Sequence, residues 1–303
     1  MSAPRLSVVI VTYRSRAVLD DCLGALAFAT RHLPHEVIVV DNGSGDGAPE
    51  WVARSWPAAR VLANPDNRGF TRAVNQGLEA ASGEALLLLN PDCRVTVAGL
   101  ERLLEVLALD PRNAAVAPML VDEEGRPARS CGRFPSLWSL ACEHLGLARR
   151  FPRSPWLAGH KYGHRALESL GRVGWCSGAA LLMSRAAYRR LGGLDEKIFM
   201  YMEEVDWCRR AHQAGLLVRF VPQARFVHRG QHAARQAPEA TYVHNLRSRI
   251  YYVRKHHGVF QAGIVKGILA ASLAGKWLAT RAGWSRAGEP RIYARGWEAV
   301  WAA

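Results

Sequence analysis

The apolar run Ala85–Leu89, followed at once by Asn90, Pro91 and Asp92, limits the fold of this 303-residue chain more than any other stretch. Five consecutive apolar residues are typical of a strand buried on both faces, as in the centre of a parallel sheet. Pro91 has no amide proton and restricts the residue before it, so the chain must leave the sheet there. Asp92 then lies just beyond the carboxyl end of a central strand, where open α/β sheets bind ligands. Its carboxylate can hold a divalent cation against a phosphate, or simply cap the helix that follows.

Strand-like and helix-like segments alternate along the N-terminal part of the chain. Strands are predicted at Leu6–Val11, His35–Val40, Arg60–Ala63, Ala85–Leu89 and Ala114–Met119, and helices at Ala17–Thr30, Phe70–Ala81 and Val97–Leu109. This alternation indicates right-handed βαβ units and a mostly parallel sheet flanked by helices, the Rossmann-like form of the α/β class. The first strand is not followed by G-x-G-x-x-G, and the chain has no P-loop signature. These absences argue against a dinucleotide-dependent dehydrogenase and a P-loop NTPase.

Periodicity is weaker over residues 120–172, which predicts an excursion across the sheet rather than a sustained strand. Regular segments return after it, with strands at Gly174–Met183 and Leu216–Val221 and helices at Arg185–Leu191 and Glu203–Ala214. The chain is then expected to leave the sheet over Pro222–Gly230, because proline cannot continue a ladder. Two further helices are predicted at Glu239–His257 and Val259–Ala279.

The cysteines and the first residues bear on the cellular compartment. Six cysteines occur without a C-x-x-C pair, which argues for a reducing compartment and against structural zinc. The first apolar run, Leu6–Val11, is too short to be the core of a signal peptide. The sequence therefore predicts a cytoplasmic protein.

Positive charge is concentrated at the C-terminal end, since residues 207–303 hold 16 Lys and Arg against three acids and carry +13 of the net +14. Val259–Ala279 is strongly apolar, but Lys266 and Lys276 within it argue against a transmembrane helix. A helix lying in the interface of an anionic membrane fits better. Packing on the domain, or on another copy in a homo-oligomer, remains an alternative. No binding motif for nucleic acid accompanies this charge, so nucleic acid is not expected as a partner.

Polar residues follow four of the predicted strands, namely Thr12 and Tyr13, Asp41, Asn64–Gly69, and Asn90–Asp92. Because the carboxyl ends of parallel strands meet at one edge of a sheet, we expect these residues to converge. Asp41 can accept a hydrogen bond from a base or a ribose, and an aromatic ring can stack on the base. Turn chemistry is a sufficient explanation for each stretch taken singly, and most clearly for Asn42-Gly43.

Three carboxylates open the helix predicted near residue 203: Glu203, Glu204 and Asp206. A structural role is sufficient for them, because the helix dipole favours acids there and Asp206 can pair with Arg210. The functional alternative is a general base beside an apolar wall formed by Phe199 and Trp207. His228 lies past another strand end; a lone histidine is more often structural, but this position is compatible with a cation site shared with Asp92.

Seven short motifs occur in an order that resembles one known family. They are Ser-Val-Val-Ile-Val-Thr-Tyr (7–13), Val-Asp-Asn-Gly-Ser (40–44), Asn-Arg-Gly-Phe-Thr-Arg-Ala-Val-Asn (67–75), Leu-Leu-Asn-Pro-Asp (88–92), Trp-Cys-Ser-Gly (175–178), Gly-Leu-Asp (193–195) and Tyr-Met-Glu-Glu-Val-Asp (201–206). The chain resembles family 2 glycosyltransferases, and within them the bacterial rhamnosyltransferase-like group. The resemblance covers about residues 5–230; each motif is weak alone, but their joint order is specific.

The resemblance implies a GT-A fold with a nucleotide-sugar-binding half (1–119), an acceptor-binding and catalytic half (120–232) and a basic helical C-terminal extension (233–303). It assigns the donor to Thr12, Tyr13, Asp41, Asn67, Gly69, Asn75 and Asn90, a Mg²⁺ or Mn²⁺ ion to Asp92 and His228, the catalytic base to Glu204, and the acceptor to Trp175, Cys176, Ser177 and Gly178. Two positions depart from the family pattern. Asn90 replaces the first acid of the Asp-x-Asp metal motif, as in the rhamnosyltransferase-like group. Glu204 replaces the more usual Asp, so Glu203 and Asp206 remain alternative bases.

The implied activity is inverting, metal-dependent transfer of a sugar, with rhamnose as the candidate, to a hydroxyl of a glycan or lipid-linked acceptor in cell-envelope polysaccharide synthesis. The donor would be a dTDP-, UDP- or GDP-sugar. The enzyme would then be cytoplasmic and peripheral at the inner face of the membrane. Two alternatives stay open: a nucleotidyltransferase, and a non-catalytic module that binds nucleotide sugars. The first would want a basic glycine-rich loop after the first strand, and residues 12–15 contain no glycine.

Overall fold

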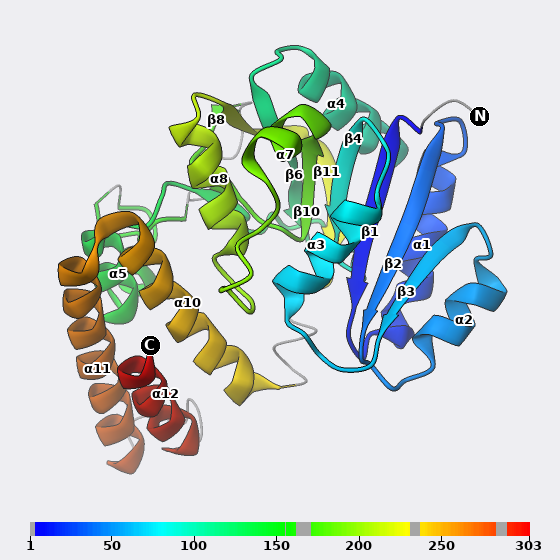
Figure 1. The fold of residues 1–303 in the computed structure, drawn as a ribbon. Helices are drawn as coiled ribbons and strands as arrows, with labels where there is room; N and C mark the ends of the chain where they lie inside the picture. The colour runs from blue at the N-terminus through cyan, green and yellow to red at the C-terminus, as the bar shows by residue number, and fades with distance from the viewer. Residues whose placement is uncertain (1–3, 155, 162–170, 231–236, 283–289) are drawn as a thin grey trace.

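The computed structural model describes residues 4–154, 156–161, 171–230, 237–282 and 290–303. Figure 1 shows a central sheet with helices on both faces and a group of helices at the C-terminal end. The N-terminal part contains β1 (Leu6–Thr12), α1 (Arg16–Thr30), β2 (His35–Asn42), α2 (Ala48–Ser55), β3 (Ala59–Asn64), α3 (Phe70–Ala80), β4 (Ala85–Leu89), β5 (Cys93–Arg94), α4 (Val97–Ala108) and β6 (Asn113–Val121). The remainder contains β7 (Cys131–Gly132), α5 (Leu137–His144), α6 (Leu147–Arg150), β8 (Gly171–Arg172), β9 (Trp175–Cys176), β10 (Ala180–Ser184), α7 (Arg185–Leu191), α8 (Glu203–Gln213), β11 (Leu217–His228), α10 (Pro238–His257), α11 (Val259–Arg281) and α12 (Pro290–Ala302).

The main sheet has nine strands, eight of which follow the order β3-β2-β1-β4-β10-β6-β11-β5 while β8 pairs with β11. Strands β1 to β4 are parallel, and so are β6 and β11. Strand β10 runs antiparallel between β4 and β6. The sheet is therefore parallel in its N-terminal half and mixed beyond it, which confirms the predicted α/β class.

Apolar side chains cover both faces of this sheet. All five residues of β4 are buried, as the run Ala85–Leu89 predicts. Alternate residues of β1 point to opposite faces: Val9 joins a cluster with side chains of α3 and α8, whereas Val8 joins one with side chains of α1 and α4. Packing on both faces holds the carboxyl ends of β1, β2 and β4 at one edge of the sheet.

Three segments differ from the sequence-based expectation. The predicted strand Gly174–Met183 is two short strands, β9 and β10, because the chain turns between them. Helix α2 forms in a stretch for which no element was predicted; Pro49 lies in its first turn, a position that needs no amide donor. Residues 120–172 contain α5 and α6, and Figure 1 shows α5 away from the main sheet and beside α11.

The prediction that the chain leaves the sheet after Val221 is wrong. Strand β11 continues to His228, and its register against β6 shifts between Val221 and Arg225. Pro222 lies in this irregular stretch, where a missing amide proton does not break the ladder. The continued strand pairs with β5, so that His228 lies opposite Cys93. Because Cys93 follows Asp92 in the chain, this pairing places His228 close to Asp92.

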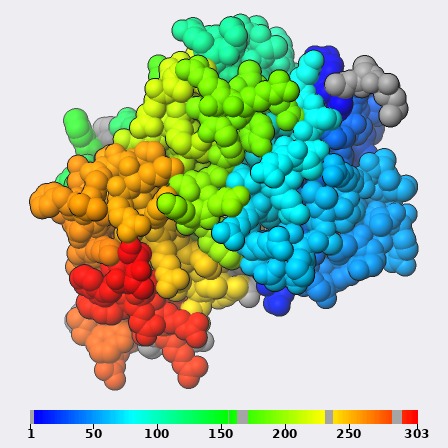
Figure 2. All heavy atoms as spheres, viewed as in Figure 1, coloured from blue at the N-terminus to red at the C-terminus, as the bar shows by residue number. Residues whose placement is uncertain are grey.

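The C-terminal helices pack on the domain as well as on one another. Side chains of α10, including Ile250 and Tyr252, are fully buried in the cluster that covers one face of the sheet. Helix α11 is tied to α5 by the Ser272 hydroxyl, which donates to the carbonyl oxygen of His144 at 2.7 Å. Figure 2 shows the C-terminal helices as a lobe on the opposite side of the molecule from the N-terminal half.

Among the described residues, one helix is long and apolar enough to cross a membrane by length and composition, and it is α11. A core helix of a soluble protein passes the same test, so the finding is weak by itself. Of the most apolar 18-residue window of α11, 28% is buried inside the protein. Most of that window is therefore exposed or only partly buried in the described structure.

Candidate active site

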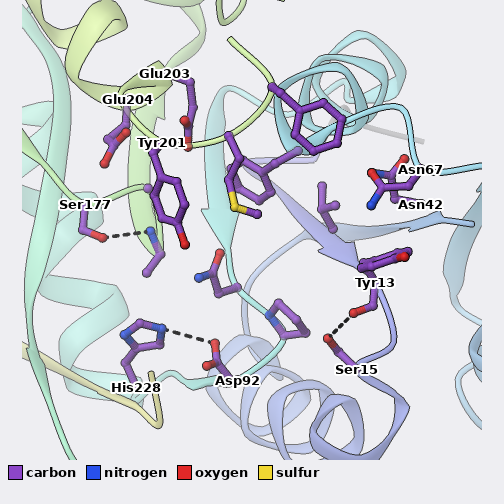
Figure 3. Close-up of a pocket in the computed structure, with 18 residues that line it drawn as sticks. Tyr13, Ser15, Asn42, Asn67, Asp92, Ser177, Tyr201, Glu203, Glu204 and His228 are labelled. Atoms are coloured by element: carbon purple, nitrogen blue, oxygen red, sulfur yellow. Dashed lines mark hydrogen bonds and ion pairs between the residues drawn. The ribbon is translucent and has the colours of Figure 1, made fainter. Parts of the chain in front are cut away.

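A cavity of about 290 Å³ opens at the carboxyl edge of β1, β2 and β4. Figure 3 shows Tyr13, Asn42 and Asn67 on one side of it and Glu203, Glu204 and Ser177 on the other, with Asp92 and His228 between them on the same floor. Its lining residues are Val11, Tyr13, Ser15, Asn42, Asn67, Phe70, Asn90, Pro91, Asp92, Ser177, Gly178, Ala179, Phe199, Met200, Tyr201, Glu203, Glu204 and His228. The polar ends of the parallel strands therefore converge, as the topology predicts.

The ends of β1 and β2 provide polar atoms beside the cavity. Thr12 and Asp41 are opposite each other in the register of these strands, and both are buried. One carboxylate oxygen of Asp41 accepts from the Ser44 amide at 3.1 Å. The other oxygen, like the Thr12 hydroxyl, has no hydrogen-bond partner among the described residues. Of Thr12, Tyr13 and Asp41, only Tyr13 lines the cavity itself.

Asn42 lines the cavity, although the sequence assigns it only a turn role. Its amide nitrogen donates to Asn67 Oδ1 at 2.9 Å and to the Gly69 carbonyl oxygen at 3.2 Å. Its amide oxygen accepts from the Arg68 amide at 3.2 Å. Asn42 therefore fixes the loop between β3 and α3, and the only sequence signal for it was its place directly after Asp41.

Gly69 and Asn75 have structural roles in the described chain. Gly69 has φ of +91°, and a Cβ added to it would lie 2.8 Å from the ring of Phe199, so a side chain has no room there. Asn75 accepts from the Leu194 amide at 2.8 Å and donates to the Leu194 carbonyl oxygen at 2.9 Å. Asn67 lines the cavity, whereas Asn75 does not. Asn75 joins α3 to the segment before α8.

Asp92 and His228 lie together on the cavity floor. Asp92 Oδ1 is 3.2 Å from His228 Nε2, and Figure 3 shows both side chains directed toward each other. Asp92 is fixed by the turn after β4, where the Asn90 amide donates to the Ala179 carbonyl oxygen at 2.8 Å. The pairing of β11 with β5 supplies His228. Two strands that meet at the sheet edge thus create the predicted pair.

The donor atoms of this pair fit a divalent cation. Two ligands bound at about 2.1 Å and at a right angle lie about 3 Å apart, close to the observed separation. A carboxylate oxygen and an imidazole nitrogen are donors that first-row divalent metals accept. The thiol of Cys93 lies within 4.8 Å of both groups. Burial, and then Asp92, raise the pKa of that thiol well above its usual value, so it stays protonated and is a poor ligand for a hard cation.

Glu203 and Glu204 start α8 after two residues with left-handed backbone, Tyr201 (φ +67°) and Met202 (φ +72°). Such strain in non-glycine residues is concentrated at functional sites. Both glutamates line the cavity, and one carboxylate oxygen of each has no hydrogen-bond partner among the described residues. Burial raises the pKa of both carboxyls; the charge of Glu204 adds to the rise at Glu203, whereas backbone hydrogen bonds and Lys161 oppose the rise at Glu204. A carboxylate with one oxygen free of a partner and with a raised pKa is suited to accept a proton.

Asp206, the other alternative base, is fully buried and already paired. Its carboxylate binds Arg210 at 3.0 Å, Lys255 at 2.7 Å and His256 at 2.7 Å. Burial opposes ionisation, but His256 and Lys255 outweigh it and lower the pKa of Asp206 to about 2. Asp206 does not line the cavity and instead joins α8 to α10.

The predicted acceptor residues divide into two pairs. Ser177 and Gly178 line the cavity, and the Ser177 hydroxyl accepts from the Ala179 amide at 3.3 Å. Trp175 and Cys176 are buried behind them and do not line it. The Trp175 indole donates to the Arg133 carbonyl oxygen at 2.8 Å, which satisfies its one polar atom. Trp175 therefore forms the wall that supports Ser177 and Gly178.

Of the apolar wall that the sequence placed beside the base, Phe199 lines the cavity and Trp207 does not; Met200 and Tyr201, which line it next to Phe199, were missed, and the shape of this wall depends on α10. The Phe199 ring stacks on His244 of α10, with centroids 4.1 Å apart. The Ser248 hydroxyl of α10 donates to the Met200 carbonyl oxygen at 2.8 Å. These contacts join residues more than forty positions apart, so local pattern gave no signal for them.

Residues 7–192 match the sequence profile of the family described as "Glycosyl transferase family 2". The matched segment covers more than half of the chain and contains β2 to β10, the loops of the nucleotide side and the Asn-Pro-Asp turn. The chain belongs to glycosyl transferase family 2. It is therefore a glycosyltransferase, as the ordered motifs predicted, and the alternatives of a nucleotidyltransferase and a non-catalytic module are set aside.

Curated relatives place this glycosyltransferase near rhamnosyltransferases. It is 34% identical over 282 residues to the N-acetylglucosaminyl-diphospho-decaprenol L-rhamnosyltransferase of Mycobacterium tuberculosis, covering 89% of this chain and 90% of the relative. It is 24% identical over 215 residues to the low-salt glycan biosynthesis hexosyltransferase Agl10 of Haloferax volcanii, covering 70% of this chain and 62% of that protein. The predicted rhamnosyltransferase-like assignment is confirmed.

Solved structures share the fold of this glycosyltransferase. GalNAc-T7, crystallised with UDP, GalNAc and Mn²⁺, matches 84% of this chain and 48% of its own with a TM-score of 0.60 and 18% identity. The mannosyltransferase PcManGT from Pyrobaculum calidifontis, in complex with GDP-Man and Mn²⁺, matches 100% of this chain and 86% of its own with a TM-score of 0.58 and 18% identity. The GT-A fold is confirmed; the roles of individual site residues stay predictions.

Proposed function

We propose that this glycosyltransferase moves L-rhamnose from a nucleoside diphosphate sugar to a hydroxyl of a lipid-linked glycan acceptor in cell-envelope polysaccharide synthesis. The choice of sugar and acceptor is supported by the mycobacterial relative, whose name gives a rhamnosyl group and a diphospho-decaprenol acceptor. That relative aligns with nearly the whole length of this chain. The proposal therefore extends to the acceptor half and not only to the nucleotide side.

One observation carries the mechanism: a single cavity contains the Asp92–His228 pair and the carboxylate of Glu204. Direct transfer of a sugar needs one group that holds the diphosphate and another that takes a proton from the acceptor hydroxyl. The pair lies on the floor of the cavity and Glu204 on one wall, and the anomeric carbon of a bound donor would lie between them. This arrangement leaves room for an acceptor hydroxyl to approach from the side of Glu204.

The donor nucleotide is assigned to the side that Tyr13, Asn42 and Asn67 line. The Asp41 carboxylate and the Thr12 hydroxyl keep oxygen atoms without hydrogen-bond partners among the described residues, and such buried oxygens are costly unless a ligand satisfies them. A base or a ribose offers the N–H and O–H donors that would do so. The Tyr13 ring can stack on the base, as aromatic side chains do in other sites.

A Mg²⁺ or Mn²⁺ ion is assigned to Asp92 and His228. When bound, the ion stabilises the negative charge that develops on the departing nucleoside diphosphate. The proposal is supported by the 3.2 Å separation of the two ligand atoms and by the Mn²⁺ in two structural neighbours. Asn90 contributes an amide rather than a second carboxylate, so Asp92 is the one acid of the Asn-Pro-Asp motif.

Glu204 is assigned as the general base. Its carboxylate takes the proton from the acceptor hydroxyl while that oxygen forms a bond to the anomeric carbon and the bond from that carbon to the diphosphate breaks. The proton remains on Glu204, and the electron pair leaves with the nucleoside diphosphate. A single displacement from the opposite face inverts the configuration at the anomeric carbon. Raising the carboxyl pKa by burial makes Glu204 a stronger base once it is ionised.

The function is tested by incubating the purified protein with Mn²⁺, a set of dTDP-, UDP- and GDP-sugars, and a short-chain lipid diphosphate acceptor that carries N-acetylglucosamine. We expect transfer from dTDP-rhamnose, with the anomeric configuration inverted in the NMR spectrum of the product. Transfer of a different sugar would overturn the choice of donor. Retained configuration would overturn the single displacement.

We also propose that α11 lies in the interface of an anionic membrane at the cytoplasmic face. Its outward side exposes Phe260, Ile264 and Leu278, and a Cβ added at Gly267 or Gly275 would meet nothing within 4 Å. Arg281, at the end of the helix, is exposed and can reach lipid headgroups, whereas Lys276 lies near the Tyr242 ring of α10. The exposed apolar side chains are the surface that an interfacial helix would bury in the membrane.

Leu278→Glu tests this membrane proposal, and Leu109→Glu is its matched control because both leucines are similarly exposed, at 59% and 65%. The wild type and the control should float with vesicles that contain anionic lipid at low salt, while Leu278→Glu should float markedly less. Wild-type protein that stays in solution with these vesicles would contradict the proposal.

A further inference from the structure

A group of cations lies beside Glu204, on the side of the cavity away from the nucleotide half. It comprises Arg129, which precedes β7, Lys161, and Arg249 of α10. The charges of Arg129, Arg249, Glu143 and Glu204 all act on the ammonium of Lys161, so Lys161 is the cation that connects this group to the base. Three separate segments of the chain meet here, and the mechanism above uses none of these cations.

The acid within this group, Glu143 of α5, is already engaged. Its carboxylate accepts from Arg249 Nη1 at 2.9 Å and also pairs with the ring of His160. Burial would raise the pKa of Glu143, but His160 and Arg249 outweigh it and lower that pKa strongly, so the carboxylate is ionised. Glu143 therefore neutralises Arg249 rather than Lys161.

Lys161 is held in place by its backbone. It forms a β-bridge with Gly132, and its carbonyl oxygen accepts from Arg129 Nη2 at 2.5 Å. Its ammonium lies 6.0 Å from the centroid of the Trp175 ring and has no hydrogen-bonded carboxylate among the described residues. Lys161 is exposed as a whole residue, but the burial of its ammonium, followed by the charge of Arg249, lowers the pKa of that ammonium.

The backbone connects Lys161 to the base by a short path. Gly132 pairs with Trp175 across β7 and β9, and two residues later Ser177 and Gly178 line the cavity. A Cβ added to Gly178 would lie 3.6 Å from Glu204 Cβ, so this turn touches the base directly. Lys161 is not itself a lining residue, but it lies behind the turn of the acceptor side and within electrostatic range of Glu204, just outside the cavity.

We infer that Lys161 binds the phosphate attached to the acceptor sugar of a lipid-linked diphosphate acceptor. The inference rests on the proposed function, because it presupposes such an acceptor. With one hydroxyl of the acceptor sugar at Glu204, the substituent on its anomeric carbon lies one sugar ring away, at the rim. A neutral sugar hydroxyl can be bound without a positive charge. A phosphate is negatively charged, so an ammonium that has no carboxylate partner is suited to bind it. The ammonium is a compact charge with three donors that suits a phosphate oxygen.

Lys161→Gln tests the inference, with Lys161→Arg as the charge-preserving variant and Arg102→Gln, on the far side of the sheet, as the control. Each full-length protein is assayed with two acceptors that carry the same sugar, one as a short-chain lipid diphosphate and one as an alkyl glycoside without phosphate. Lys161→Gln should raise KM for the diphosphate acceptor about tenfold or more. The KM for donor and that for alkyl glycoside should stay within about twofold, and Lys161→Arg should retain most of the affinity.

Equal changes in KM for the two acceptors would overturn the inference. A shift of the acid limb of the pH–rate profile with no difference between the acceptors would show instead that Lys161 only adjusts the pKa of Glu204. If the wild type uses the diphosphate acceptor alone, farnesyl diphosphate at saturating donor serves as the second probe. Its inhibition constant against acceptor should rise about fivefold or more in Lys161→Gln, and an unchanged constant overturns the inference. Wild-type transfer to either acceptor upholds the proposed function whatever Lys161 does.

Discussion

The two sides of the cavity are built in different ways. The nucleotide side comes from loops that follow β1, β2 and β3, and its contacts, such as Asn42 to Asn67, join residues of the N-terminal half. The opposite wall, Phe199 to Glu204, has a strained backbone and depends on α10 for its shape. The first side is a product of sheet topology, whereas the second needs the C-terminal extension to be in place.

This difference assigns a role to the C-terminal extension that its charge does not reveal. The stack of Phe199 on His244 and the bond from Ser248 to Met200 hold the wall, while Asp206 is held by Lys255 and His256. Helix α10 therefore supports the wall of the cavity that contains Glu203 and Glu204. A change in α10 should alter use of the acceptor before it alters binding of the donor.

The largest effect is expected on the cavity floor, where the two sides meet. Asp92→Asn removes the one carboxylate of the cation pair and should weaken Mn²⁺ binding by about 10–100-fold or more. Titration of Mn²⁺ followed by electron paramagnetic resonance measures this without any turnover. Asp20→Asn, an exposed acid on α1, is the control and should bind Mn²⁺ as the wild type does. If Asp92→Asn bound Mn²⁺ as tightly as the wild type, the assignment of the cation to Asp92 and His228 would be wrong.

A smaller effect is expected at the wall. Ser248→Ala deletes the bond to the Met200 carbonyl oxygen and should cost about 1 kcal/mol of unfolding free energy. It should also lower kcat/KM for acceptor several-fold while KM for donor stays the same. Ser272→Ala is a close match, because that buried hydroxyl also donates to a backbone carbonyl, that of His144, but far from the cavity.

The matched pair distinguishes support of the wall from general stability. Both variants should lose similar stability in denaturant titrations, but only Ser248→Ala should change the kinetics. Similar kinetic losses in the two variants would mean that the wall responds to overall stability and not to the contact with α10.

The smallest effect concerns stability and pH. Burial, followed by the charge of Glu204, raises the pKa of Glu203 well above its usual value. The folded protein therefore keeps a proton that an unfolded glutamate loses near pH 4.3, and stability falls as the pH rises above that value. Glu203→Gln removes this dependence and should raise the free energy of unfolding by on the order of 1 kcal/mol at pH 8, and by less at pH 4.5.

Denaturant titrations at the two pH values measure the effect. Glu101→Gln, which replaces an exposed glutamate on α4, should show no such difference between them. A gain in Glu203→Gln that does not depend on pH would mean that Glu203 is ionised in the folded protein.

The contrast between the two sides also explains what the sequence predicted. Short-range patterns located β1, β3 and β4 and hence the convergence of Tyr13, Asn67 and Asp92, because each strand end follows from its own residues. The same reasoning ended β11 at Val221, since no local signal shows that a strand resumes after a bulge. His228 was predicted as a ligand by resemblance, and its position depends on long-range pairing with β5.

Residues that act through distant contacts were harder to predict. Asn75 fits the family motif but binds Leu194 away from the cavity, and Trp175 supports the acceptor turn from behind. Met200 lines the cavity because Ser248, many residues later, fixes its carbonyl group. Hydrophobic periodicity and composition describe one segment of the sequence at a time, so they do not predict contacts between residues that are far apart in the chain.

The central claim is that the nucleotide side binds the donor while Glu204 activates the acceptor, and Glu204→Gln separates these tasks. Binding of the nucleotide sugar with Mn²⁺ is measured by isothermal titration calorimetry, and transfer by single-turnover kinetics on the same protein. We predict a dissociation constant within about twofold of the wild type, together with a transfer rate lower by about 10²–10⁴-fold. Transfer at the wild-type rate, or loss of donor binding, would contradict this division of the cavity.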